Sequence, residues 1–139
     1  MLLHVIARGK IGRSPEAELV ERYLKRIAWP IKLTELSERA PTPSAPSGSV
    51  TVLLDEKGKA FSSMELAKTL EQWRDRGVRE TRFIIGSADG HSEEERASAD
   101  LLISFGPATW PHLLVRALLA EQLFRVTSIL ANHPYHREG

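Results

Sequence analysis

The chain has 139 residues, of which 42% are hydrophobic and 27% charged, with a formal net charge of +1 and no cysteine. This length fits one domain with a sizeable core, and the missing thiols exclude disulfides, cysteine nucleophiles and cysteine-ligated metals. The small net charge argues against broad non-specific nucleic-acid binding, which depends on many uncompensated basic residues. No uncharged run approaches the length of a membrane helix, and the apolar residues 2–7 lack a basic leader. We therefore expect a soluble, unexported, cytoplasmic protein.

Short apolar or β-branched runs predict five strands along the chain. They cover residues 2–7, 31–36, 50–54, 82–85 and 101–104. Helices are predicted between them because capping hydroxyls precede stretches of helical spacing. These helices start after Ser14-Pro15, at Ser62 with Glu65, at Ser92 with Glu95, and near His112. Strands that alternate with helices predict an α/β fold of one domain, 1–139, with a mostly parallel sheet and helices on both faces.

Two connections between these elements have distinctive compositions. Residues 37–49 are rich in proline, serine, alanine and glycine, and we expect a flexible surface connection there. The first loop carries Arg8, Lys10 and Arg13. Because the chain is nearly neutral overall, any RNA contact must be local, and this glycine-flanked cluster is a candidate for it.

The carboxyl ends of the predicted strands define the edge where a parallel sheet binds ligands. Leu54 and Asp55 follow the third strand, residues 86–90 the fourth, and residues 105–110 the fifth. Glycines at positions 86 and 90 permit a close backbone approach to a ligand, although an ordinary turn uses them equally well.

The last third of the chain holds the most unusual residues. The 105–112 loop contains two prolines, which keep it out of helices and sheet ladders and leave backbone groups available. After the long helix the chain ends Asn132-His133-Pro134-Tyr135-His136-Arg137-Glu138-Gly139. Two imidazoles, a phenol and a guanidinium can donate, accept, stack and bind phosphate. Chain ends are often frayed and solvated, so the tail alone leaves both a site and a solvated end open.

The tail, together with Pro111-His112, Leu114-Val115-Arg116 and Ala120-Glu121, resembles the C-terminal signature of the ribosomal large-subunit methyltransferase H family. This resemblance implies a SPOUT fold with a C-terminal trefoil knot. It also implies methylation of N3 of a pseudouridine in large-subunit (23S) rRNA on assembled ribosomes, with S-adenosylmethionine as cofactor and no metal. The family's Gly-Gly-Pro-Glu-Gly loop is Gly86-Ser87-Ala88-Asp89-Gly90 here, and the 37–49 segment is shorter than usual.

The resemblance also implies which residues form the site. The cofactor would contact Leu54, Gly86, Phe105, Gly106, Pro107, Ala108, Thr109 and Trp110. The chemistry would involve Tyr135, His136, Arg137, His112 and Arg116. The arginine and histidine of the tail could stabilise the anion of the acceptor base, Tyr135 could stack or donate, and His112 or Arg116 could orient the base or the tail. No single general base is identified.

The long helix at residues 113–130 is apolar nearly all round, so it must be buried on more than one side. In the family this helix forms a homodimer in which each tail reaches the neighbouring subunit's cofactor; the alternative is burial within one monomer. We interpret Glu121 and Arg125 as an intrahelical pair, and His4 and His91 as structural.

Two other functions compete with the methyltransferase. One is a non-catalytic ribosome- or RNA-binding module of the same fold. The other is a nucleotide-binding doubly wound protein, which is disfavoured because the turn at residues 8–12 lacks both the dinucleotide glycine pattern and a phosphate-loop Gly-Lys-Ser/Thr.

Overall fold

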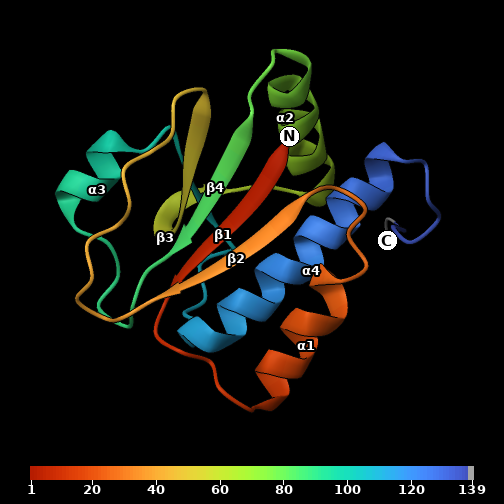
Figure 1. Ribbon diagram of the computed structural model, residues 1–139. Coiled ribbons are helices and arrows are strands. Elements are labelled where there is room, and N and C mark those ends of the chain that lie inside the picture. Colours follow the sequence, from red (N-terminus) through yellow and green to blue (C-terminus); the bar gives the residue numbers. More distant parts are fainter. Residues whose placement is uncertain (138–139) are drawn as a thin grey trace.

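A computed structural model describes residues 1–137 of the chain as one five-stranded sheet with four helices (Figure 1). The strands are β1 (Leu2–Arg8), β2 (Ile31–Leu36), β3 (Ser49–Ala60), β4 (Glu80–Ile85) and β5 (Leu101–Ser104). The helices are α1 (Pro15–Leu24), α2 (Ser63–Asp75), α3 (Glu93–Ser98) and α4 (His112–Leu130). The sheet order is β2-β1-β4-β3-β5, and every neighbouring pair is parallel. The predicted α/β class is confirmed, and the sheet is wholly rather than mostly parallel.

The predicted starts of the first three helices are confirmed by their caps. The Ser14 side chain accepts a hydrogen bond from the backbone of Ala17 and precedes Pro15 at the first position of α1. Ser62 and Ser92 each form a reciprocal capping box with the glutamate three residues later. These bonds satisfy backbone N–H groups that the first helical turn leaves without partners, which is why α1, α2 and α3 begin where they do. The α4 helix begins after Pro111 without a side-chain cap.

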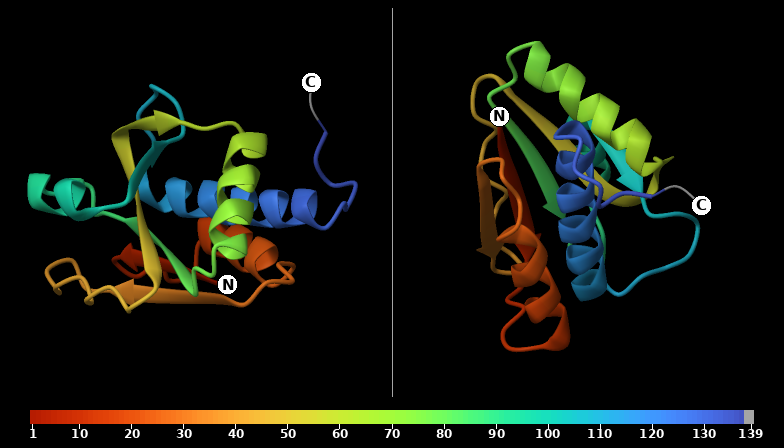
Figure 2. Two further views of the ribbon diagram at one scale, coloured as in Figure 1. Left: turned by 90° about the horizontal axis from the view of Figure 1, so that it is seen from above. Right: turned by 90° about the vertical axis from the view of Figure 1, so that its right-hand side faces the viewer.

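One face of the sheet holds the main core. Alternate residues of the strands pack there against α1, α2 and α4, and α4 lies between the other two helices (Figures 1 and 2). Leu119, Leu123 and Val126 of α4 are fully buried in this core. The chain itself therefore covers the inner side of α4 and both flanks. A strip containing Leu114, Leu118 and Arg125 stays partly exposed. None of the helices within residues 1–137 is both long and apolar enough to span a membrane.

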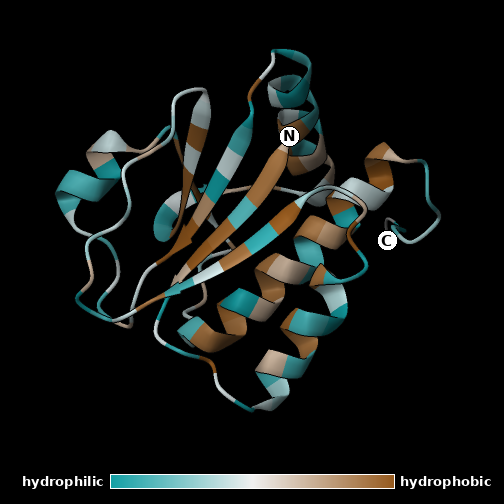
Figure 3. Cartoon of the chain, viewed as in Figure 1, coloured by the Kyte–Doolittle hydropathy of each residue, from teal (hydrophilic) through white to brown (hydrophobic). Residues whose placement is uncertain are grey.

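The opposite face is covered differently. Its small apolar cluster, Ile6, Leu53 and Ile84, meets the end of α3 at Ala99. The α3 helix itself has no buried residue and is largely hydrophilic (Figure 3). The rest of this face lies near the proline-rich connection, which sheet arginines hold: Arg82 donates to the carbonyl of Pro43 at 2.7 Å. The connection is a surface segment as predicted, but it is fastened to the sheet.

The middle of β3 departs from the prediction. The sequence predicts a strand that ends at residue 54, but β3 continues to Ala60. Leu54 and Lys59 both pair with Ile103 of β5, so the residues between them bulge out of the ladder. A Cβ atom at Gly58 would lie 2.6 Å from backbone atoms of β5, so only glycine allows the two strands to approach this closely.

Candidate functional site

A pocket of about 230 Å³ lies at the carboxyl edge of the sheet, beyond β3, β4 and β5. Its walls come from the three segments that the sequence placed there. The predicted cofactor residues that line it are Leu54, Gly86, Phe105, Gly106, Ala108, Thr109 and Trp110. Pro107 belongs to the same loop but is not among the lining residues. The structure thus brings together residues that lie up to 56 positions apart in the sequence, from Leu54 to Trp110.

The β4–α3 loop forms one wall through a tight turn. The backbone N–H of Gly90 donates to the carbonyl of Ser87 at 2.9 Å, and Gly90 has a φ of +78° that favours glycine. A Cβ atom at Gly86 would lie 3.2 Å from backbone atoms of Gly90 and from the ring of His91. The turn therefore packs directly against Gly86, and the absence of a side chain there makes room for it.

The β5–α4 loop forms the second wall. The indole N–H of Trp110 donates to the carbonyl of Phe105 at 3.2 Å, which closes the loop on itself. Gly106 has a φ of +94°, a conformation that side chains disfavour. Trp110 remains 41% exposed although it is a large aromatic residue. An exposed indole beside a pocket offers a surface on which a planar ligand can stack.

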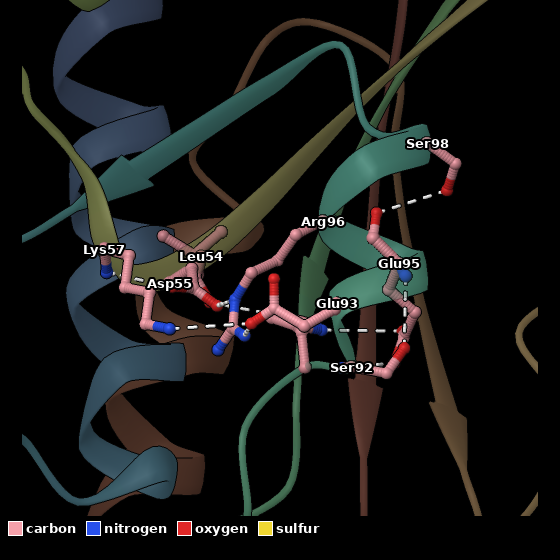
Figure 4. A network of polar contacts seen from close by, with 9 residues as sticks. Leu54, Asp55, Lys57, Ser92, Glu93, Glu95, Arg96 and Ser98 are labelled. Carbon is pink, nitrogen blue, oxygen red and sulfur yellow. Dashed lines mark hydrogen bonds and ion pairs between the residues drawn. The ribbon is translucent and has the colours of Figure 1, made fainter.

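A polar network fixes the third wall, where β3 leaves the ladder (Figure 4). Asp55 is buried, and its carboxylate accepts from Arg96 Nε and from the backbone N–H of Lys57, each at 2.8 Å. Burial alone would raise the pKa of Asp55, but these hydrogen bonds and the Arg96 charge outweigh it and hold the pKa below its ordinary value. Arg96 also lines the pocket, and no sequence pattern singled it out.

The structure separates the two candidates on the first turns of α4. His112 lines the pocket. Arg116 is only 1% exposed, and its guanidinium donates to the Glu35 carboxylate at 2.5 Å and to the carbonyl of Gly9 at 3.1 Å. Burial tends to raise the pKa of Glu35, but hydrogen bonds from the Ile11 backbone and Arg116 lower it overall. Arg116 thus fastens α4 to β2 and the first loop, and does not reach the pocket.

The tail folds back on the far end of α4. The Tyr135 ring lies 4.6 Å from that of Phe124, and its hydroxyl donates to Glu121 at 3.1 Å. His136 Nδ1 lies 3.0 Å from a guanidinium nitrogen of Arg125. The predicted Glu121–Arg125 pair is confirmed at 2.6 Å. Burial first, and then the Glu121 carboxylate, raise the pKa of Tyr135 to about 12, so this phenol stays protonated near neutrality.

These contacts keep the tail away from the pocket of its own chain. With a rise of about 1.5 Å per residue, Arg125 lies roughly 20 Å along α4 from His112. Arg137 is exposed, and Glu138, which belongs to the signature, lies outside the described residues. Within one chain, the structure therefore does not bring Tyr135, His136 and Arg137 to the predicted cofactor residues.

The three basic residues of the first loop differ in their surroundings. The Arg8 guanidinium turns toward the proline-rich connection and donates to Thr42 Oγ1 at 2.8 Å. Lys10 and Arg13 are exposed. The Arg116 bond to Gly9 places this loop beside the first turns of α4. Among residues 1–137, no group of three or more histidine or carboxylate side chains is arranged to hold a metal ion.

Two histidines were predicted to be structural, and both make internal hydrogen bonds. His4 on β1 lies 2.7 Å from Thr34 Oγ1 and 3.1 Å from Glu80. His91 is 6% exposed, and its Nε2 lies 3.1 Å from the carbonyl oxygen of Leu54. The second contact involves a residue of the pocket wall, which composition and spacing did not indicate.

Comparison with known proteins agrees with this architecture. Residues 1–136 match the family model described as predicted SPOUT methyltransferase. The chain is 68% identical to the ribosomal RNA large subunit methyltransferase H of Erythrobacter litoralis (strain HTCC2594), over the full length of both chains. It is 61% identical to the protein of that name from Zymomonas mobilis, again over both full lengths.

A more distant relative and a solved structure extend the comparison. The protein of the same name from Paramagnetospirillum magneticum is 45% identical over 99% of each chain. A probable methylase family protein from Haemophilus influenzae Rd KW20 has the same fold, with a TM-score of 0.57 at 9% identity, covering 94% of this chain and 66% of that one. The chain therefore belongs to the SPOUT methyltransferase family and, within it, to the family of ribosomal RNA large subunit methyltransferase H proteins.

Proposed function

We propose that this protein transfers a methyl group from S-adenosylmethionine to N3 of a pseudouridine in large-subunit rRNA, acting on assembled ribosomes in the cytoplasm. The observation that carries the proposal is the pocket at the carboxyl edge, which collects Leu54, Gly86 and the 105–110 loop around one space. The names of full-length relatives supply the rRNA substrate class. The trefoil knot implied by the family belongs to the same proposal.

The residues of the pocket fit an adenosine-containing sulfonium cofactor. Gly86 and the 105–110 loop line the pocket, where their backbone groups can contact a purine and a ribose. Apolar Leu54 and Ile103 line the floor, while Trp110 adds an aromatic surface. When bound, the cofactor supplies an activated methyl group, and the chain's own role is to position it for in-line displacement.

We propose that a second copy of the chain completes the site. The tail lies roughly 20 Å along α4 from His112, too far to serve the pocket of its own chain. If two α4 helices pair in opposite directions through the strip at Leu114 and Leu118, the tail of one chain approaches the pocket of the other. Most of the apolar surface of α4 is buried within its own chain, so the helix surface alone is weak support for a dimer. The proposal of a second copy rests on the distance between the tail and the pocket of the same chain.

The tail residues suit stabilisation of an anionic acceptor. N3 of pseudouridine must lose its proton before it can attack a methyl group, and nearby positive charge favours that anion. Arg137 is exposed and carries a permanent charge, and His136 adjoins the Arg125 guanidinium. Tyr135, whose pKa is raised to about 12, can donate a hydrogen bond but is a poor base near neutral pH. His112 lies at the pocket and is available to orient the base.

Mass spectrometry of large-subunit rRNA tests this proposal. Cells that lack the gene should lose one methyl group on a pseudouridine, and the purified protein with S-adenosylmethionine should restore it on their ribosomes. Unchanged rRNA masses, together with a protein that binds ribosomes but not the cofactor, would support the competing non-catalytic RNA-binding module. The pocket favours the enzyme over that module because RNA binding alone does not need it.

A further inference from the structure

His91 lies behind the pocket and touches two of its walls. The residue follows directly on the tight turn that ends at Gly90, and it is only 6% exposed. Its Nε2 lies 3.1 Å from the carbonyl oxygen of Leu54 on β3. A Cβ atom at Gly86 would lie 3.2 Å from His91 Cε1, so the ring also packs against the end of β4. Leu54 and Gly86 line the pocket, whereas His91 does not.

The hydrogen bond to Leu54 has a defined direction. A carbonyl oxygen can only accept, so His91 Nε2 carries a proton and donates it. Leu54 is the last residue of β3 before the strand bulges out of the ladder toward Lys59. His91 therefore holds the backbone of β3 at Leu54, where the regular pairing with β5 is interrupted.

The other ring nitrogen is also positioned. His91 Nδ1 lies 3.5 Å from the Glu95 carboxylate one turn along α3, and that carboxylate also accepts from the backbone of Ser92. Glu95, the glutamate of the α3 capping box, therefore also orients the His91 imidazole. Arg96 of the same helix donates to Asp55, so polar contacts hold α3, which has no buried residue, against β3 (Figure 4).

We propose that His91 is a positioning residue of the cofactor pocket, whose Nε2–H and ring hold Leu54 and Gly86 at the separation that S-adenosylmethionine requires. This inference rests on the proposed function. Without the hydrogen bond, the β3 wall samples other positions and the pocket is competent for only a fraction of the time. Apparent affinity falls by that fraction, whereas the bound complex keeps its contacts.

Three substitutions at position 91 test the proposal by calorimetric titration with S-adenosylmethionine. His91→Gln places an amide nitrogen as many bonds from Cα as histidine Nε2, and should bind within about threefold of the parent. His91→Asn is one bond too short to reach the carbonyl, and His91→Leu has no donor. Both should weaken cofactor binding by roughly tenfold or more, because the hydrogen bond to the buried Leu54 carbonyl is lost.

His4→Leu is the matched control. His4 is also largely buried with two side-chain contacts, to Thr34 and Glu80, but it lies outside the pocket. Its loss should lower the melting temperature without changing cofactor affinity. Parental affinity in both His91→Asn and His91→Leu would overturn the proposal, as would a tenfold loss in His4→Leu that equals the loss in His91→Leu.

A folding defect in a His91 variant must be distinguished from the loss of its positioning role. If His91→Leu fails to fold, the Asn and Gln variants decide, since they differ by one methylene. If the Gln variant also unfolds while His4→Leu folds, His91 serves global stability and the positioning role is wrong. A parent protein that binds no S-adenosylmethionine would instead refute the proposed function, so the two failures are distinguishable.

Discussion

The Tyr135 hydroxyl donates a 3.1 Å hydrogen bond to Glu121, and the Tyr135 ring packs on Phe124. These contacts tie the tail to α4 at a point about two and a half turns from His112, the α4 residue at the pocket. The same carboxylate pairs with Arg125, which in turn contacts His136. Tyr135 and His136 of the tail are therefore held by the helix that precedes them.

The titration of Tyr135 follows from this contact. Its folded pKa of about 12 lies above the ordinary 10.0, so the protonated phenol is favoured in the fold. The stability it contributes is present below pH 10 and is lost as the pH rises from about 10 to 12. The ultraviolet difference spectrum between the parent and Tyr135→Phe should show phenolate forming near pH 12. Phenolate formation near pH 10 would mean that the tail is not docked on α4 in solution.

The tail should serve chemistry rather than folding. His136→Ala and Arg137→Ala remove side chains beyond the end of α4, so fold and cofactor binding should remain. Methyl transfer to ribosomes should fall by roughly a hundredfold or more for each. Arg137→Lys should retain much of the rate if charge alone matters, and little if bidentate geometry is required. A double Ala variant with the parental rate would leave His112 as the remaining candidate at the pocket.

The pocket prediction is tested at Gly86. The side chain in Gly86→Val would meet Gly90 and His91 and displace the turn that forms one wall of the pocket, because even a Cβ atom there lies 3.2 Å from both. We expect calorimetry to show loss of S-adenosylmethionine binding while light scattering shows an unchanged assembly. Unchanged cofactor affinity in this variant would place the site elsewhere.

The assembly prediction concerns the partly exposed strip of α4. Light scattering at micromolar concentration should show a dimer, and Leu118→Glu should convert it to a monomer by placing a charge in the interface. Leu33→Glu, on the edge strand β2 and 36% exposed, is the control and should remain dimeric. A monomeric parent would remove the basis for a shared site.

Arg116 should act on stability. Arg116→Met removes the guanidinium that donates to the Glu35 carboxylate and the Gly9 carbonyl. Urea unfolding should show a loss of about 2–3 kcal/mol in the free energy of unfolding, less than for a fully buried pair because Glu35 is partly exposed. Since the folded pKa of Glu35 is lowered from 4.5, its contribution is present above pH 4.5 and lost as the pH falls through the folded pKa. The variant should lose less stability on acidification than the parent. Equal acid dependence would show that the pair contributes little.

Several features of this protein were decided by the sequence alone. The caps at Ser62 and Ser92 and the apolar run at residues 50–54 depend on neighbours within a few positions, so local chemistry predicts them. The alternation of strands and helices placed Leu54, Gly86 and the 105–110 loop at one edge of the sheet, and the pocket lies there. The tail signature indicated the family without any structure.

Only the tertiary structure decided which distant groups meet. Arg116 belongs to the signature, yet it binds Glu35, 81 positions earlier, because α4 packs beside the first loop. The bulge after Leu54 depends on how closely β5 approaches Gly58. The proposed positioning role of His91 depends in turn on that bulge, because His91 contacts the Leu54 carbonyl beside it. The tail's distance from its own pocket is set by the length and direction of α4. Such long-range pairings depend on topology, which spacing along a single chain does not encode.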